Sequence, residues 1–314
     1  MARIGIVGDT HGDVRDTTNV LNEMGKRKIT HVFIVGDFGL WTHFADGHAF
    51  LDTVNQVAEA NNLSVFAVGG NHENWDHWNW FIDNMPTHKG FAMVRRRVLL
   101  APKVHQFKFA GKQFVVAGGA VSIDKASRLE KEKGHYMDET GRVKRTGTGP
   151  RTLWWPNEEL TDQDVIKIQT QFPKADILLT HDCSNYTHFQ HRLKPDADSE
   201  RHRRRIDDVI RAVEPKVHFH GHMHTKYVWE NVLSHGCSAF DDKPWEGPVT
   251  KTYGLEANPN AMWGGYPKGD WAAAAVRRRS LPALLPAQSV QGAQLVTAMF
   301  IDLGSGNEFP RLTS

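Results

Sequence analysis

Five short apolar runs in this chain each end in a turn that carries aspartate, asparagine or histidine. The runs are rich in β-branched and aromatic residues, as buried strands are. They occupy residues 3–7, 32–35, 65–68, 177–179 and 217–219. Segments with helical spacing of apolar residues, at 13–24 and 43–60, lie between the first of these runs. This alternation predicts strand–helix–strand units and a mainly parallel sheet.

The remaining sequence predicts further strands and one more long helix. A hairpin is expected from 104–109 and 114–117, a helix at 199–213, and strands at 217–220, 227–232 and 295–303. We therefore expect a single α/β domain over residues 1–314, with two sheets packed together and helices outside. Two stretches rich in polar residues, glycine or proline, 131–152 and 257–292, break the pattern and are expected to be exposed insertions.

Charge and cysteine content exclude several classes of protein. The net charge of +2 gives no overall basic field of the kind that attracts nucleic acid. The two cysteines, Cys183 and Cys237, are most simply free thiols in a reducing compartment, so a cytoplasmic location is expected. The first residues already form a strand, and no apolar run approaches the ~20 residues of a membrane span. We expect neither a signal peptide nor a membrane partner, and the sequence leaves the oligomeric state open.

The polar turns are expected to meet in space. The carboxyl ends of parallel strands lie along one edge of a sheet, where ligands bind. His222 and His224 alternate with Met223, so in an extended strand both would point the same way. The candidate ligands that follow the five runs are Asp9, His11, Asp37, Asn71, His181, His222 and His224.

This donor set favours a metal centre. Imidazole and carboxylate bind divalent transition metals such as manganese, iron and zinc. No cysteine pair has the spacing of a structural zinc site. Seven donors are too many for one ion with an open position, and they suit two ions that share a bridging carboxylate.

Each turn taken alone has an ordinary explanation. Gly-Asp after a strand is usually a turn, Asn-His a helix cap, and His-Gly-His a surface loop. Five matches in order after five strands are much harder to explain in that way. The remaining histidines near these turns match no ligand spacing and are interpreted as packing or surface residues: His188, His191, His218 and His220.

As an ordered set, these motifs resemble those of the calcineurin-like metallophosphoesterases. The resemblance covers residues 4–224 and the closing strand near 295–303, and it includes "GNHE" at 70–73. It implies a four-layer αββα sandwich of two mixed sheets flanked by helices, with two divalent ions in the cleft between the sheets. Manganese is the ion most expected, with iron or zinc as alternatives. One ion would be held by Asp9, His11, Asp37 and His224, and the other by Asp37, Asn71, His181 and His222, with Asp37 bridging.

The chain departs from part of this family after the second motif. The stretch "GDFGLW" at 36–41 lacks the arginine with which the phosphoprotein-phosphatase branch grips a monoester phosphate. The stretch 118–161, "GGAVSIDK…WWPNEELT", resembles a feature of some bacterial and phage members. The missing arginine argues against the phosphoprotein-phosphatase branch.

The resemblance implies a phosphoesterase. Two ions would lower the pKa of a water between them, and the resulting hydroxide would attack phosphorus in line with the leaving oxygen. His72 would protonate that oxygen as a general acid, or would only orient the water. The leading hypothesis is a phosphodiesterase for small or nucleotide-like diesters. The alternatives are a phosphomonoesterase or protein phosphatase on the same scaffold, and a non-catalytic binding scaffold.

Basic and aromatic clusters leave the substrate open. The arginine runs at 95–97, 201–205 and 277–279 are interpreted first as solvated surfaces, although they could attract a nucleotide or nucleic acid. Trp75, Trp78 and Trp80 could wall the substrate cleft or could simply pack. The substrate partner is therefore expected to be a phosphate ester without further definition.

Overall fold

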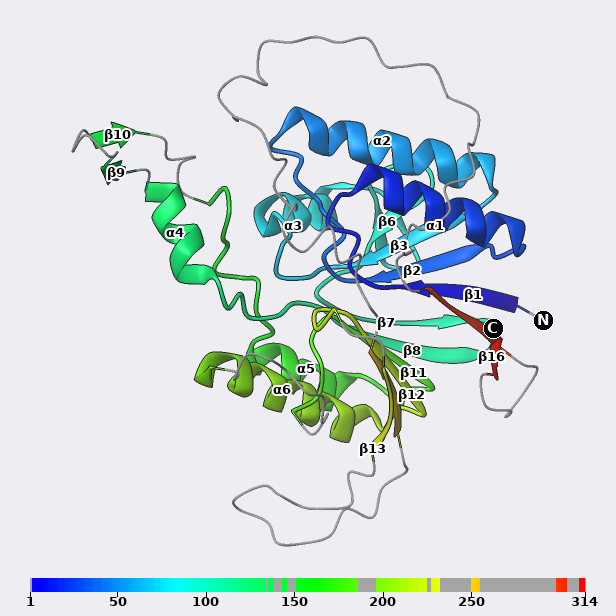
Figure 1. The fold of residues 1–314 in the computed structure, drawn as a ribbon. Helices are drawn as coiled ribbons and strands as arrows, with labels where there is room; N and C mark the ends of the chain where they lie inside the picture. Colours follow the sequence, from blue (N-terminus) through cyan, green and yellow to red (C-terminus); the bar gives the residue numbers. More distant parts are fainter. Residues whose placement is uncertain are drawn as a thin grey trace, which may run out of the picture.

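The structure is a computed structural model, and its strands form two large sheets with helices on their outer faces (Figure 1). This confirms the expected architecture of two mixed sheets flanked by helices. The structure describes residues 2–133, 135–137, 143–145, 151–185, 196–224, 227–231, 250–254, 298–303 and 311–313.

In this described part of the chain, the first sheet has eight strands in the order β16-β15-β1-β2-β3-β6-β5-β4. Its centre is parallel, as the strand–helix alternation predicts: β1 (Ala2–Val7), β2 (His31–Val35), β3 (Ser64–Val68) and β6 (Val98–Leu100). Its edges are antiparallel: β4 (Thr87–His88), β5 (Phe91–Met93), β15 (Ala298–Leu303) and β16 (Arg311–Thr313).

The second sheet has six strands among the described residues, in the order β13-β14-β12-β11-β8-β7. The expected hairpin is present as β7 (Val104–Phe109) and β8 (Lys112–Ala117). The other strands are β11 (Ile177–Thr180), β12 (Val217–His220), β13 (Tyr227–Asn231) and β14 (Thr250–Gly254). The second sheet is parallel from β8 through β11 and β12 to β14.

Several of the helices begin at a capping side chain. Asp13 accepts a hydrogen bond from the backbone N–H of Asp16, and Thr161 forms a capping box with Asp164. Helices α1 (Val14–Lys26), α2 (Ala45–Ala60) and α3 (Trp75–Asn84) cover the eight-stranded sheet, and α5 (Asp162–Gln171) and α6 (Ala197–Val213) cover the six-stranded sheet (Figure 1).

Three apolar clusters among the described residues hold these layers together. The side chains of β2 alternate between two of them: Val32 and Ile34 pack toward the helices α1 to α3, whereas Phe33 and Val35 pack toward the second sheet. The third cluster joins the outer face of the six-stranded sheet to α5 and α6. Central strands are thus buried on both faces, which explains why they read as continuous apolar runs. Three clusters between four layers give the αββα arrangement.

The segment expected as an exposed insertion at 131–152 contains secondary structure. Helix α4 (Lys125–Lys133) continues to residue 133, and β9 (His135–Met137) pairs with β10 (Val143–Arg145), away from the main sheets (Figure 1). The buried Glu132 carboxylate accepts backbone N–H groups of residues 152–154, which fixes the helix to the returning chain. The second expected insertion, 257–292, lies outside the described residues.

Two further expectations concern cysteine and membranes. Cys183 is a buried free thiol, whereas Cys237 lies outside the described residues. In the part of the chain that the structure describes, no helix has the length and apolar character needed to cross a bilayer.

We predict that Phe33→Ala strongly destabilises the fold. Phe33 is buried between the sheets and stacks on Phe66, Phe107 and Phe114 at ring-centroid distances of 5.0, 5.7 and 5.6 Å. Its truncation should lower the free energy of unfolding by about 3–5 kcal/mol, measured as a shift of the urea midpoint. The control Ile166→Ala, on the exposed face of α5, should change it by less than about 0.5 kcal/mol. A loss below about 1 kcal/mol for Phe33→Ala would contradict this packing.

Candidate metal centre

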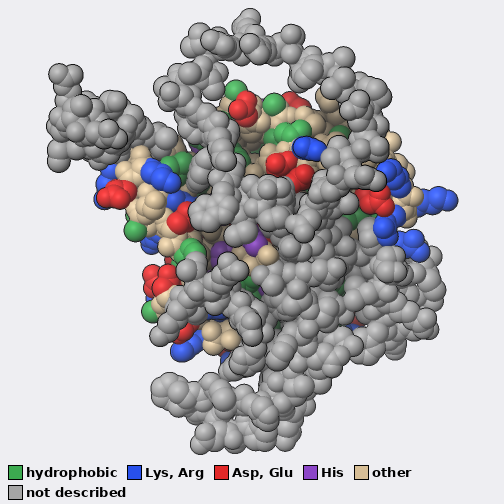
Figure 2. Space-filling model, in the orientation of Figure 1, with side chains coloured by type: hydrophobic (Ala, Val, Ile, Leu, Met, Phe, Trp, Pro, Cys, Tyr) green, Lys and Arg blue, Asp and Glu red, His purple; other side chains and the backbone are tan. Residues whose placement is uncertain are grey.

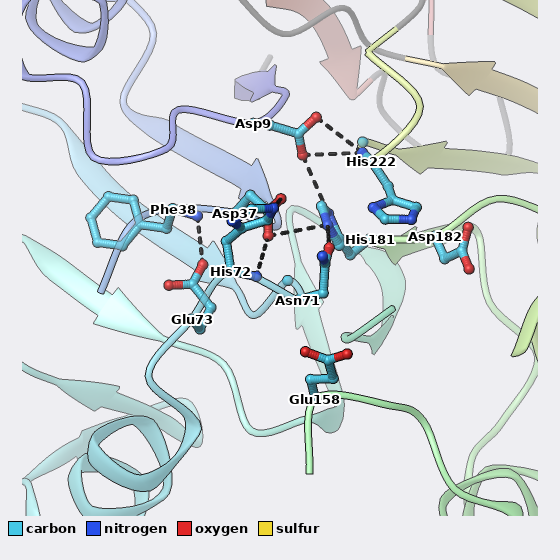
Figure 3. A network of polar contacts seen from close by, with 12 residues as sticks. Asp9, Asp37, Phe38, Asn71, His72, Glu73, Glu158, His181, Asp182 and His222 are labelled. Atoms are coloured by element: carbon cyan, nitrogen blue, oxygen red, sulfur yellow. Dashed lines mark hydrogen bonds and ion pairs between the residues drawn. The ribbon is translucent and has the colours of Figure 1, made fainter. Parts of the chain in front are cut away.

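The seven candidate ligands are placed by turns at the ends of five strands. Asp9 and His11 follow β1, Asp37 follows β2, and Asn71 follows β3, all in the eight-stranded sheet. His181 follows β11, and His222 and His224 follow β12, in the six-stranded sheet. The structure brings these turns together at the junction of the two sheets (Figure 3). The cluster is therefore assembled from both sheets.

Four of these residues have left-handed backbone, which is uncommon for residues other than glycine. Their φ angles are +48° for His11, +44° for Asp37, +63° for His222 and +50° for His224. Gly36 also has positive φ, and a Cβ there would overlap the His181 ring. Such strain persists where the surrounding structure enforces it, and it is concentrated at functional sites.

Asp37 is in contact with most of the cluster. Its Oδ1 lies 3.3 Å from His181 Nε2 and accepts the backbone N–H of His72 at 2.9 Å. Its Oδ2 lies 3.8 Å from His11 Nδ1 and 4.0 Å from His72 Nε2. Its backbone oxygen accepts the N–H groups of Thr10 and His11. One buried residue thus ties the turns after β1, β3 and β11 to the turn after β2.

Asp9 connects the turn after β1 to the turn after β12. Its carboxylate accepts the backbone N–H of His222 at 3.0 and 3.1 Å. Its Oδ2 lies 3.6 Å from His224 Nε2, and its Oδ1 lies 3.3 Å from His181 Nδ1. His224 Nε2 also lies 3.2 Å from His11 Nε2. These contacts bring three histidines of the six-stranded sheet to a carboxylate that follows a strand of the eight-stranded sheet.

The cluster has more lone pairs than protons. The two ring nitrogens of His181 face four oxygen atoms: Val35 O at 3.0 Å, Asp9 Oδ1 at 3.3 Å, Asn71 Oδ1 at 3.0 Å and Asp37 Oδ1 at 3.3 Å. A neutral imidazole has only one N–H to donate. The facing Nε2 atoms of His11 and His224 can likewise share one proton at most when both rings are neutral. A divalent cation satisfies such a set, so these residues fit a metal centre.

The pKa values of the buried groups reflect this crowding of donor atoms. Burial lowers the pKa of His181, but the Asp37 and Asp9 carboxylates outweigh it and raise the pKa to about 10. Burial raises the pKa of Asp9 to about 6, although His181 opposes it. A proton on His181 thus occupies a position that a cation would take. A metal ligand must lose such a proton before it binds an ion.

Two groups of donor atoms are close enough to share an ion among the described residues. One comprises His11, Asp37 and His72, and the other comprises Asp37, His181 and His222; within each group the donor atoms lie within 4.8 Å of one another. Asp37 belongs to both groups. The first group contains His72, which the sequence analysis assigned to catalysis and not to the metals. The individual ligand assignments and the bridging role of Asp37 stay predictions.

A hydrogen-bond chain behind Asn71 was not foreseen from the sequence. The Asn71 amide Nδ2 donates to Ser122 Oγ at 3.1 Å, and Ser122 Oγ donates to Glu158 Oε2 at 2.8 Å. This chain turns the amide oxygen of Asn71 toward His181. Burial raises the pKa of Glu158 to about 7. Both new residues lie in the stretch 118–161, which the sequence analysis singled out without assigning it a role.

Glu73, the last residue of "GNHE", holds the turn that follows Asp37. Its carboxylate accepts the backbone N–H groups of Phe38, Gly39 and Leu40 at 2.5, 3.2 and 2.7 Å. Figure 3 shows the contact with Phe38. Burial raises the pKa of Glu73 to about 8, partly with the help of the neighbouring Asp37 charge. The glutamate thus fixes the loop and lies away from the candidate metal donors.

The other histidines and the tryptophans mostly pack. His218 and His220 are fully buried, and His218 Nε2 contacts Thr180 Oγ1 at 2.7 Å. Trp75 and Trp78 are also fully buried, whereas Trp80 is exposed on α3. Packing is therefore the correct interpretation for Trp75 and Trp78, while His188 and His191 lie outside the described residues.

The basic runs are surface features only in part. Arg95 pairs with Asp52, and Arg201 pairs with Asp198. Arg203, however, is buried on α6, so the expectation of a solvated face is wrong for that residue. An amphipathic helix buries whichever side chains fall on its inner face, and Arg203 falls beside the buried His202. The run 277–279 lies outside the described residues.

Comparison with known proteins identifies the family to which this set of motifs belongs. A family model described as calcineurin-like phosphoesterase matches residues 2–226. A search of curated proteins gives no match. Similar solved structures include a dimetal phosphatase from Danio rerio, with 12% identity, a TM-score of 0.46, and coverage of 81% of this chain and 87% of that chain. They also include the protein TT1561 of Thermus thermophilus, with 12% identity, a TM-score of 0.41, and coverage of 81% and 89%.

We predict that Asp37→Ala reduces bound metal more than alanine at any other of the seven candidate ligands. The reason is that Asp37 belongs to both donor groups, so its loss affects both ions. Metal content is measured after dialysis for all seven alanine variants. The control Asp83→Ala removes an exposed carboxylate of α3 and should leave metal content unchanged. Retention of both ions by Asp37→Ala would show that Asp37 does not bridge them.

Proposed function

Because the family model covers residues 2–226, the chain belongs to the calcineurin-like phosphoesterases, and we propose that it is a metal-dependent phosphodiesterase acting on small or nucleotide-like diesters. The observation that carries this proposal is the His/Asp cluster at the junction of the two sheets. A non-catalytic scaffold has no need for such a cluster, in which buried lone pairs face one another. The proposed compartment is the reducing cytoplasm, in accord with the free thiol of Cys183.

The ligand assignment follows the family. We infer that Asp9, His11, Asp37 and His224 would hold one cation, and that Asp37, Asn71, His181 and His222 would hold the other. When bound, two such cations supply an activated water nucleophile and offset the negative charge on phosphoryl oxygens. Manganese is the ion proposed, with iron or zinc as alternatives.

His72 is the residue proposed to act on the leaving oxygen. Its side chain is 25% exposed, whereas Asp37 and His181 beside it are buried. Histidine side chains also reach the surface near the centre of the face in Figure 2. Burial and the Arg128 guanidinium lower the pKa of His72 well below its usual range, against the Asp37 carboxylate. Its partial exposure places His72 to meet substrate, and its lowered pKa favours the neutral ring, which can donate one hydrogen bond from its N–H.

The turn after β2 favours a diester over a monoester. The side chains of Phe38 and Leu40 are fully buried in the cluster that faces the helices, and their backbone N–H groups are bound by Glu73. This turn thus offers no cationic side chain that could bind the second negative charge of a monoester phosphate. A phosphomonoesterase stays the second candidate, because the guanidinium of Arg128 reaches His72 from another direction.

We predict that matched aryl diesters are cleaved better than aryl monoesters. A monoester carries nearly two negative charges at neutral pH and is best held by a bidentate arginine, whereas a diester carries one. The measurement is kcat/KM for both esters with manganese at neutral pH. A monoester preference of tenfold, about 1.4 kcal/mol of transition-state binding, would establish the phosphatase instead. Absence of activity on every ester with metal bound would favour the scaffold.

We predict that His72→Ala keeps its metals but loses rate by roughly 10²–10⁴ on diesters with poor leaving groups. The loss should shrink when the leaving alcohol is acidic, because that oxygen needs little help. The matched control is His48→Ala, which removes an exposed histidine of α2 and should leave the rate unchanged. Equal losses on good and poor leaving groups would show that His72 positions water or phosphate and does not assist departure.

A further inference from the structure

The chain between β8 and α5 buries three charged side chains, two of which connect to the turn after β3. Arg128 and Glu158 are each 1% exposed, and Glu132 is 8% exposed. We call residues 122–133 and 151–158 the bracket. Buried charges are costly unless they are paired or hydrogen-bonded, so three in one short segment call for a specific arrangement of partners.

Two of these charges fix the bracket itself. Glu132 Oε1 accepts the backbone N–H groups of Thr152, Leu153 and Trp154 at 2.9, 2.7 and 2.9 Å. Glu158 accepts the backbone N–H of Ser122 at 2.8 Å. Helix α4 is thereby held against the returning chain at both ends of the bracket, which determines where its inward side chains lie.

Arg128 is the inward side chain that reaches the candidate site. Its Nε pairs with Asp124 Oδ1 at 2.8 Å, one turn earlier in the chain. Its Nη1 donates to Asn71 O at 3.2 Å and to Leu153 O at 3.4 Å. Its Nη2 lies 2.7 Å from His72 Nε2 and 3.2 Å from His72 Nδ1. One guanidinium therefore joins α4, the returning chain and the turn after β3.

A guanidinium has only hydrogen-bond donors, so the His72 ring accepts the bond from Nη2. The planar fork of Arg128 is itself held by Asp124 and two backbone carbonyls, so it restricts where the accepting ring can lie. The Nε2 atom of this imidazole, 2.7 Å from Arg128 Nη2, also lies 4.0 Å from Asp37 Oδ2, so the guanidinium and the carboxylate both approach the same ring atom. Its position relative to the metal-centre donors is set by a residue 56 positions away in the sequence.

We propose that Arg128 is a positioning residue for the phosphoesterase reaction, which holds the His72 ring in place beside the metal centre. This inference rests on the proposed function and on the proposed action of His72 on the leaving oxygen. The turn after β2 lacks an arginine, and α4 instead delivers a guanidinium to the imidazole of His72.

The test is a double-mutant cycle of Arg128→Ala and His72→Ala, assayed on a diester with a poor leaving group. Arg128→Ala alone should lower kcat by about 10–100-fold, with metal content and KM close to those of the original protein. In the His72→Ala background, the same change should alter kcat by less than about threefold, because the ring that Arg128 positions is gone. Equal fold-losses in both backgrounds would overturn the proposal and make Arg128 merely structural.

Two further variants separate positioning from folding. Arg128→Lys keeps a positive charge but lacks the planar fork, and it should recover only part of the rate. The matched control is Arg201→Ala, which removes an exposed arginine of α6 and should leave kcat unchanged. Full recovery by Arg128→Lys would show that charge alone matters and would overturn the positioning role. Arg128→Lys also serves as the test variant if Arg128→Ala does not fold.

A readout that needs no activity distinguishes failure of this inference from failure of the proposed function. The ring signals of His72 are assigned in nuclear magnetic resonance spectra by their loss in His72→Ala. Arg128→Lys should shift those signals and leave the signals of His48 unchanged. If the metal-loaded protein is inactive on all esters but the shift occurs, the proposed function fails and the contact stands. Unchanged His72 signals would overturn the inference whatever the activity.

Discussion

The Asp37 carboxylate is buried where the two sheets meet, and contacts from several turns converge on it. Its oxygens face His181 from one sheet and His11 and His72 from the other. A buried carboxylate with such neighbours cannot be moved or removed without leaving charge or lone pairs unsatisfied. The position of each sheet at this edge is therefore constrained by one side chain. Glu73 adds to this constraint because it holds the backbone that follows Asp37.

The strands and the candidate ligands could be predicted because their signals are local. Continuous apolar runs mark strands buried on both faces, and the residues after Val7, Val35 and Val68 break those runs abruptly. Strand ends in a parallel sheet share an edge, so convergence follows from topology without any distance information. The expectation of four layers came from the family resemblance of the ordered motifs. The short strands at 87–88, 91–93 and 98–100 were missed, because runs of two or three residues have no detectable period.

The bracket could not be predicted because its signals are not local. "KASRLEKEK" is a strongly charged sequence, and such helices normally lie in solvent. Arg128 and Glu132 are buried through partners on other segments, namely His72 and the backbone of residues 152–154. Nothing in one sequence identifies such partners. The same limit applied to Glu158, whose role depends on Ser122, 36 positions earlier.

The strand that precedes Asp9 completes its pairing only at the far end of the chain. β1 pairs with β2 on one side, but on the other side it pairs with β15, from Ala2 opposite Leu303 to Val7 opposite Ala298. During synthesis at roughly 5–20 residues per second, the open edge of β1 waits about 15–60 s for that partner. An unpaired strand edge is a template for wrong pairing with other chains. The nascent protein therefore carries an open β1 edge, at which wrong pairing can start, until β15 has been translated.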